Sequence, residues 1–278
     1  MNTPARPPGR PPTPPQAPPQ AQLSAGGSAP VDVVGRVAAL LRVLSDGEPA
    51  GVSTSAAARA CGLARPTVHR LLTSLAETGL AERDEHGAWV LGPELFLLGN
   101  AAAQRYDVTS VARPFVRRLS QVSGESAFLS VRRGDESVCL VREDGSFPIR
   151  SHVLHEGIRF PLGVASAGLA LLAFLPDREV EELLARLDLS GYGEEHASGP
   201  LRRRLETTRL TGWALNPGLI VEGSWGMAAA VFDAEENPRW ALSLTGIEHR
   251  FTPARRRELG PLLLREAHAL SKALQQRA

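Results

Sequence analysis

The stretch that most constrains the fold runs from Ser53 to Thr78, where two short helical patterns are joined by a single glycine. The first pattern begins near Ser53, carries small apolar residues, and stops at Gly62. The second has one apolar stripe at i, i+3, i+4 and i+7, made of Val68, Leu71, Leu72 and Leu75. A glycine in such a junction lets the second helix cross the first. The stretch therefore predicts a helix-turn-helix.

The flanking residues extend this motif to a winged helix over residues 31–92. Asp32 is a candidate cap for a preceding helix, which has apolar residues at helical spacing. After Gly79, two short extended segments at 80–83 and 88–91 surround a glycine-containing loop, which is typical of a hairpin. Three helices followed by a hairpin give the winged-helix order.

Charge along the motif indicates DNA binding. The chain as a whole has a net charge of +1, which excludes a histone-like protein that binds by bulk charge. Residues 49–76 nevertheless contain no acidic residue. The expected DNA-binding residues of the motif and the hairpin are Ser53, Arg59, Arg65, Thr67, His69, Arg70, Thr73, Arg83 and His86. A small helical bundle with a solvated arginine-rich face is the plainer alternative.

Composition and periodicity divide the rest of the chain. Residues 1–30 hold ten of the prolines and almost no large apolar residue, which predicts a disordered tail. Pro93 starts an expected linking helix over 93–106. Residues 107–278 mix strands with helices, beginning with a helix whose expected buried face is Val111, Phe115, Leu119 and Val122. The fold class is therefore α/β (α+β) with two domains.

Motifs in both parts resemble the IclR family of regulators. In the first part these are residues 62–72, then Leu75 and residues 79–83; in the second they are residues 157–162, 170–176, 212–214, 228–233 and 241–246. The resemblance covers roughly residues 31–275. It implies a winged helix-turn-helix followed by a GAF- or profilin-like domain, residues 107–278, for effector binding and oligomerisation. It also implies a homodimer or homotetramer on double-stranded operator DNA, because a dimer can read two half-sites.

The resemblance also implies a small-molecule effector site. Carried over by position, the effector-binding residues are Ser166, Ala167, Asn216, Gly226, Ser243 and Thr245. Ser243 and Thr245, two apart on a strand, point to one face, and a helix start near Ser166 can bind a carboxylate. Family members often have a lysine where this chain has Leu169, an aspartate at 216 and a cysteine at 226. These departures predict a roomier, less polar site and a larger, more apolar effector than a two-carbon acid.

Two other functions compete with this interpretation. A hydrolase would use Ser166, but the glycine before it lies three residues away, so a nucleophile elbow does not fit. We therefore expect no catalytic residue, no cofactor and no metal. The third possibility is a DNA-binding protein whose second domain only oligomerises.

The sequence predicts a cytoplasmic, nucleoid-associated protein without a membrane partner. No basic stretch followed by an apolar run opens the chain. The uncharged run from Phe160 to Pro176 is short for a bilayer span and contains proline and glycine. Cys61 and Cys139 are the two cysteines, and their separation favours neither a disulfide framework nor a zinc site.

Overall fold

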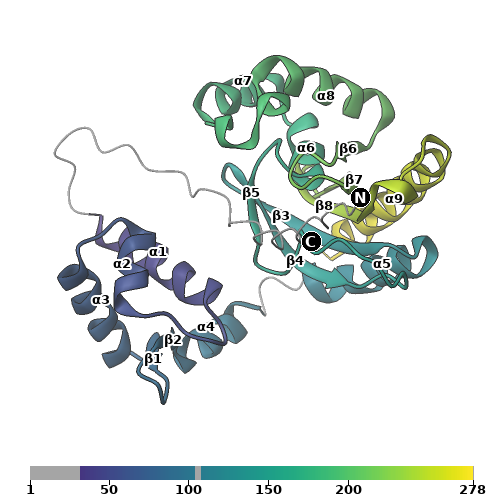
Figure 1. Ribbon diagram of the computed structural model, residues 1–278. Helices are drawn as coiled ribbons and strands as arrows, with labels where there is room; N and C mark the ends of the chain where they lie inside the picture. Colours follow the sequence, from purple (N-terminus) through teal and green to yellow (C-terminus); the bar gives the residue numbers. More distant parts are fainter. Residues whose placement is uncertain (1–31, 104–107, 278) are drawn as a thin grey trace, which may run out of the picture. The chain divides into compact units, whose positions relative to one another are not determined.

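The computed structural model describes residues 32–103 and 108–277, which separate into two compact units. The smaller unit holds the N-terminal helices and the hairpin, and the larger one begins at Val108 (Figure 1). The proline-rich tail expected at 1–30 lies outside the described residues, as does the end of the expected linking helix at 104–106. Among the helices described, none combines the length and apolar character needed to cross a membrane.

The smaller unit contains three helices, a two-stranded hairpin and a fourth helix. The helices are α1 (Val33–Asp46), α2 (Thr54–Cys61), α3 (Arg65–Glu77) and α4 (Pro93–Ala103), and the antiparallel strands are β1 (Ala81–Arg83) and β2 (Trp89–Leu91). Asp32 caps α1 by accepting a hydrogen bond from the Gly35 amide. This is the winged-helix order that the sequence predicts.

One apolar cluster holds this unit together. Leu40 and Leu44 of α1 meet Ala57 of α2 and Val68 and Leu72 of α3, all fully buried. The small Ala57 lets the helices approach closely. Trp89 closes the cluster from the hairpin, and its indole Nε1 donates to Thr54 Oγ1 at 3.0 Å. The hairpin is thereby fixed to the start of α2.

The larger unit is built on a six-stranded antiparallel sheet in the order β5-β4-β3-β8-β7-β6. The strands are β3 (Ser126–Arg133), β4 (Glu136–Glu143), β5 (Arg159–Pro161), β6 (Ala214–Pro217), β7 (Ser224–Phe232) and β8 (Pro238–Ile247). The central strands are buried on both faces, so their apolar residues do not alternate strictly with polar ones.

Helices cover both faces of this sheet. Helices α5 (Val108–Ser123) and α9 (Pro253–Gln275) pack on one face, where they bury Leu242 and Leu244. Helices α6 (Ser166–Ala173), α7 (Asp177–Arg186) and α8 (Ser198–Thr211) form the layer on the other face. Because residues alternate along β8, Ser243 and Thr245 point toward the α6 side. Three short 3-10 turns, at 190–192, 194–196 and 248–250, complete the unit.

The sequence misjudges the buried face of α5. Val122 is exposed, whereas Ala112, Val116 and Leu119 are fully buried. The packed stripe of α5 therefore lies about one residue away from the predicted one. Near the C-terminal end of α5 the buried residues are the small polar Ser120 and Ser123 instead of apolar ones. The Ser120 hydroxyl donates to the Asp144 carbonyl at 2.7 Å.

Candidate DNA interface and effector cavity

The junction between α2 and α3 depends on the backbone of Gly62. This residue has φ +63° and ψ 27°, the left-handed conformation that L side chains rarely adopt. Its amide bonds back to the carbonyls of Ala58 and Arg59, and the Leu63 amide bonds to Ala58 at 3.0 Å. These bonds end α2 and set the direction in which α3 leaves.

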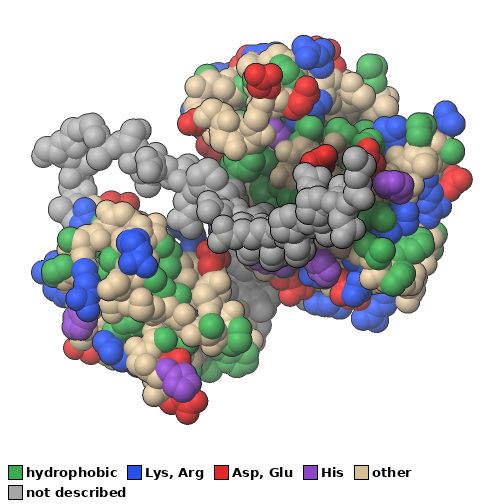
Figure 2. Space-filling model, viewed as in Figure 1, with side chains coloured by type: hydrophobic (Ala, Val, Ile, Leu, Met, Phe, Trp, Pro, Cys, Tyr) green, Lys and Arg blue, Asp and Glu red, His purple; other side chains and the backbone are tan. Residues whose placement is uncertain are grey.

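The buried and exposed sides of α3 are clearly separated. Val68, Leu72 and Leu75 face the core. On the opposite side the exposed residues include Arg65, His69, Arg70 and Thr73, while Thr67 is half-buried. No ion pair to a described residue involves Arg59, Arg65 or Arg70 (Figure 2 shows basic side chains at the edge of this unit near α3). This face presents cationic donors that are available to phosphates or bases.

The remaining predicted DNA-binding residues lie around α3. Ser53 is exposed and caps α2, since its hydroxyl accepts from the Ala56 amide at 3.2 Å. Arg83 of β1 stacks over the Trp89 ring at 4.5 Å, and the cation therefore has a defined position on the hairpin. His86 is exposed at the hairpin tip beside Glu85, at 3.5 Å. These three residues have structural contacts of their own, unlike the arginines of α3.

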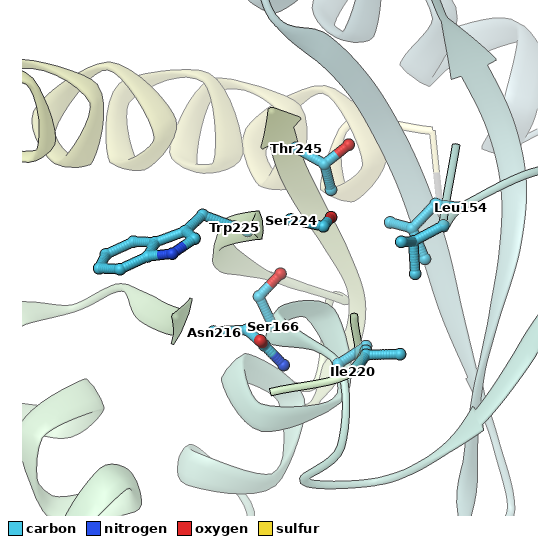
Figure 3. Close-up of a pocket in the computed structure, with 10 residues that line it drawn as sticks. Leu154, Ser166, Asn216, Ile220, Ser224, Trp225 and Thr245 are labelled. Atoms are coloured by element: carbon cyan, nitrogen blue, oxygen red, sulfur yellow. The ribbon is translucent and has the colours of Figure 1, made fainter. Parts of the chain in front are cut away.

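The larger unit contains a small cavity between α6 and the ends of β6, β7 and β8 (Figure 3). Its lining includes Ser166, Asn216, Gly226 and Thr245, four of the six predicted effector residues. Ala167 and Ser243 are buried but do not line it. Val153, Leu154, Ala165, Ile220, Ser224 and Trp225 complete the wall, and none of these side chains is charged.

Two hydroxyl groups on the α6 side of β8 have no hydrogen-bond partner within the described part of the chain. They are Thr245 Oγ1, which lies in the cavity wall, and Ser243 Oγ, which lies deeper in the sheet. A buried hydroxyl without a partner costs free energy, so a ligand that reaches it gains a hydrogen bond. Helix α6 starts at Ser166, which lines the same cavity as Thr245, and no side chain caps it. Its first amides have no partners within the helix and attract anions.

Asn216 has a structural role that the sequence did not indicate. Its Nδ2 donates to the Val164 carbonyl at 2.8 Å, and its Oδ1 accepts from the Leu219 amide at 2.9 Å. The asparagine thus ties β6 to the residues that lead into α6 and fixes the turn after β6. Both of its polar atoms are engaged, which leaves less capacity for a ligand than the resemblance implies.

His196 is a residue that sequence reasoning missed. It is buried, and its Nε2 lies 3.4 Å from the same Val164 carbonyl, while its Nδ1 lies 2.8 Å from the Tyr192 carbonyl. Burial lowers the pKa of His196, and the nearby Arg204 guanidinium adds to this effect. The neutral ring therefore supports the Val164 carbonyl, which directly precedes the cavity-lining Ala165. A single histidine in a polar loop gives no sequence signal for such a contact.

The absence of a side chain at Gly226 shapes the cavity. A Cβ built there would lie 3.0 Å from Ser166 Oγ, closer than nine in ten such contacts. Only about 20 Å³ of this cavity is open to the centre of a water molecule, and a site roomier than that of other family members stays a prediction. That space holds about one water. Leu154, Ile220 and Trp225 supply the largest apolar side chains of the lining.

Each of the two units matches a model of a known protein family. Residues 33–85 match the IclR helix-turn-helix domain, and residues 100–272 match the bacterial transcriptional regulator IclR C-terminal domain. The glycerol operon regulatory protein of Streptomyces griseus is 32% identical over 78% of this chain and 85% of its own. The transcriptional repressor AllR of Klebsiella pneumoniae is 31% identical over 82% and 85%.

A solved structure shows the same fold. An IclR homologue from Microbacterium hydrocarbonoxydans, crystallised with 4-hydroxybenzoate, superposes with a TM-score of 0.71 at 24% identity, covering 88% of this chain and 99% of its own.

An IclR helix-turn-helix domain and an IclR C-terminal domain in one chain define a DNA-binding transcriptional regulator, not an enzyme. The chain belongs to the IclR family. The fold class and the family expected from the sequence are thereby confirmed.

Proposed function

We propose that this regulator binds operator DNA through α3 and responds to a small organic carboxylate held in the cavity of its larger unit. The observation that carries the effector proposal is the buried Thr245 hydroxyl, which has no partner among described residues and belongs to a residue that lines the same cavity as the uncapped start of α6. Ser166, on the first turn of α6, adds a second hydroxyl. Such a site supplies hydrogen-bond donors to an anion without a cationic side chain.

The effector we propose is larger and more apolar than a two-carbon acid. The apolar lining consists mainly of Leu154 and Ile220 on one side of the hydroxyl-bearing residues and Trp225 on the other (Figure 3). An aromatic or short fatty carboxylate would place its acid group at Thr245 and its apolar body against these side chains. Because the space present holds about one water, such a ligand requires these side chains to move.

The DNA-binding proposal rests on a second copy of the chain. Three consecutive residues of α4 are exposed, Phe96 by 71%, Leu97 by 58% and Leu98 by 53%. An apolar helix of this kind, directly after the hairpin, favours burial against its counterpart in another protomer (Figure 2 shows apolar side chains on this unit near α4). A homodimer or homotetramer would place two α3 helices in successive major grooves of a palindromic site.

Ligand control would follow from linkage. An effector that binds one dimer geometry more tightly than another changes the population of the geometry that fits the operator. Residues 93–106, which follow the hairpin of the smaller unit in the chain, would transmit that change. Because the proposed operator is chromosomal, we also propose a cytoplasmic, nucleoid-associated location.

The effector proposal is tested by calorimetric titration of the full chain with benzoate, 4-hydroxybenzoate, glyoxylate and pyruvate. We expect saturable binding of an aromatic acid, weakened about tenfold or more in Thr245→Val, which removes the hydroxyl at nearly constant volume. Thr207→Val is the matched control, because Thr207 lies exposed on α8 and bonds only within its helix. Micromolar saturation by glyoxylate or pyruvate alone would contradict the proposed effector class.

A further inference from the structure

Two loops from opposite ends of the sheet meet over the effector cavity. The segment between β4 and β5, residues 144–158, contributes Val153 and Leu154 to its wall. The turn between β6 and β7, residues 218–223, contributes Ile220, and Ser224 follows at the start of β7. Together these residues reduce the open space to about 20 Å³. A carboxylate of several heavy atoms therefore fits only when lining residues of these loops move apart.

A hydroxyl pair joins the two loops where they meet. Ser151 Oγ and Ser224 Oγ lie 2.6 Å apart, a short hydrogen bond between residues 73 positions apart in the chain. Ser151 is buried and Ser224 lines the cavity, so the contact joins the cavity wall to the 144–158 loop. One hydrogen bond between uncharged groups is weak enough to break transiently and strong enough to favour the closed arrangement.

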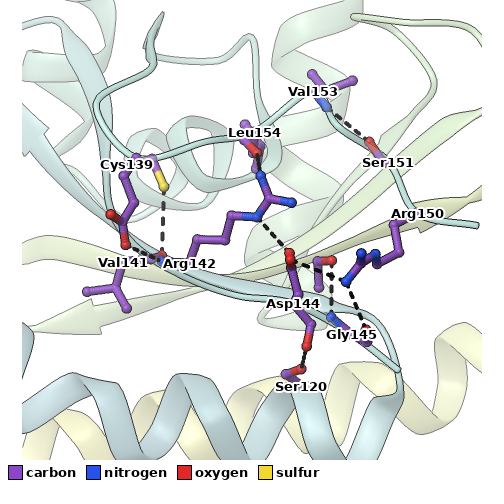
Figure 4. Close-up of polar contacts among 12 residues, drawn as sticks. Ser120, Cys139, Val141, Arg142, Asp144, Gly145, Arg150, Ser151, Val153 and Leu154 are labelled. Atoms are coloured by element: carbon purple, nitrogen blue, oxygen red, sulfur yellow. Dashed lines mark hydrogen bonds and ion pairs between the residues drawn. The ribbon is translucent and has the colours of Figure 1, made fainter. Parts of the chain in front are cut away.

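The rest of the 144–158 loop is held firmly to β4 (Figure 4). Arg142 bonds Asp144 at 2.7 Å and the Leu154 carbonyl at 3.5 Å, and Arg150 pairs with Asp144 at 3.2 Å. Breaking the Ser151–Ser224 bond leaves these contacts intact. Opening can thus be confined to the line where the two loops touch.

We infer that the Ser151–Ser224 pair is the entrance to the effector cavity, and that Leu154 and Ile220 behind it determine how large a molecule is admitted. This inference rests on the proposed effector site, but it concerns access and not affinity. The two serines act by holding the loops together and do not need to touch the bound ligand. Ile220 and Leu154 line the same side of the cavity with apolar branches (Figure 3), so shortening one of them widens the space.

Access can be measured without knowing the effector. In the full chain with Cys61→Ser, a Thr245→Cys substitution places a thiol in the cavity wall, and its modification by methyl methanethiosulfonate is followed by mass spectrometry. Cys139 is the internal control, because it is 3% exposed and burial raises its pKa to about 12. Its modification reports unfolding of the whole unit. Ser166→Cys serves as a second reporter should Thr245→Cys fold poorly.

We expect Ser151→Ala and Ser224→Ala each to accelerate modification roughly fivefold, as loss of one hydrogen bond predicts. The double variant should react no faster than either single variant, because both remove the same bond. Ser190→Ala, which removes an exposed hydroxyl bonded to Asp188, should change nothing. Unchanged modification rates in both single serine variants, or fully additive effects in the double variant, would contradict the proposal that this pair forms the entrance.

A bulky aromatic reagent, 5,5′-dithiobis(2-nitrobenzoate), tests the size limit. We expect Ile220→Ala to accelerate this reagent severalfold more than the small one. Equal acceleration of both reagents would contradict the role of Ile220. These experiments use neither DNA nor effector. Modification rates that contradict the entrance therefore do not contradict the proposed function, and a ligand titration without binding does not affect how the modification rates are read.

Discussion

At the scale of single residues, the backbone carbonyl of Val164 contacts two side chains from separate segments. Val164 directly precedes Ala165, which lines the cavity. The Val164 carbonyl accepts from Asn216 Nδ2 at 2.8 Å and faces His196 Nε2 at 3.4 Å. Val164 precedes the first turn of α6 by two positions, so these contacts position the hydroxyl of Ser166. His196 therefore affects the cavity without lining it.

The lowered pKa of His196 predicts a dependence of stability on pH. The unfolded chain takes up a proton near pH 6.5, whereas the buried ring resists protonation until lower pH. The stabilisation is therefore complete above about pH 6.5 and is lost as the pH falls through the folded pKa. Urea unfolding of the wild type should show a steeper loss of stability on acidification than His196→Gln, which keeps a donor but does not titrate. Parallel curves for the two proteins would contradict this role.

Residue roles were only partly predictable from the sequence. The apolar stripe of α3 identifies its buried face, and with it the exposed arginines, because that inference depends on local periodicity alone. The engagement of Asn216 and the contact of His196 depend on where distant segments meet, which periodicity does not reveal. Thr245 lies between these cases. The face of its strand is predictable, but the lack of a hydrogen-bond partner for its hydroxyl among the described residues is not.

At the scale of elements, the helix-turn-helix is determined mainly by one backbone conformation. Gly62→Ala places a Cβ in open space, so crowding has no part, but it forces an L side chain to φ +63°. We expect the free energy of unfolding of the smaller unit to fall by about 1–2 kcal/mol. Chemical denaturation measures the change, followed by Trp89 fluorescence in a chain with Trp213, Trp225 and Trp240 replaced by phenylalanine.

Gly99→Ala is the matched control for that experiment. Gly99 lies inside α4, is exposed, and a Cβ there meets nothing within 4 Å. Because alanine favours helices, the variant should be unchanged or slightly more stable. A Gly62→Ala protein as stable as Gly99→Ala would show that the junction does not require the left-handed conformation.

Elements with strong periodicity were predictable, and short edge strands were not. The helices of the smaller unit appear where apolar spacing indicates them. β5 has three residues and β6 has four, and both pair at the edges of the sheet. Segments this short carry no repeat to detect, and unlike β1 and β2 they are not joined to each other by a glycine-containing hairpin loop. Their strand conformation comes from hydrogen bonds to β4 and β7. α5 was found, but its buried face was misplaced by the serines near its end.

At the scale of the whole molecule, each unit has its own core, and the two clusters of the larger unit are separated by its sheet. Independent cores allow the DNA-reading unit and the sensing unit to keep their structures while their spacing changes. A regulator of this class can therefore convert ligand binding into a change in the separation of its reading heads, which is the coupling we propose.

The central claim is that the exposed face of α3 reads an operator, and the most direct test is fluorescence anisotropy on the DNA upstream of its own gene. The protein is titrated at near-physiological salt with non-specific competitor. We predict saturable, competitor-resistant binding that weakens at least tenfold, about 1.4 kcal/mol, in Arg70→Ala. Arg178→Ala, an exposed arginine paired with Glu182 on α7, should bind as the wild type does. Equal affinity of Arg70→Ala and wild type, or binding that any DNA competes away, would contradict the assigned face.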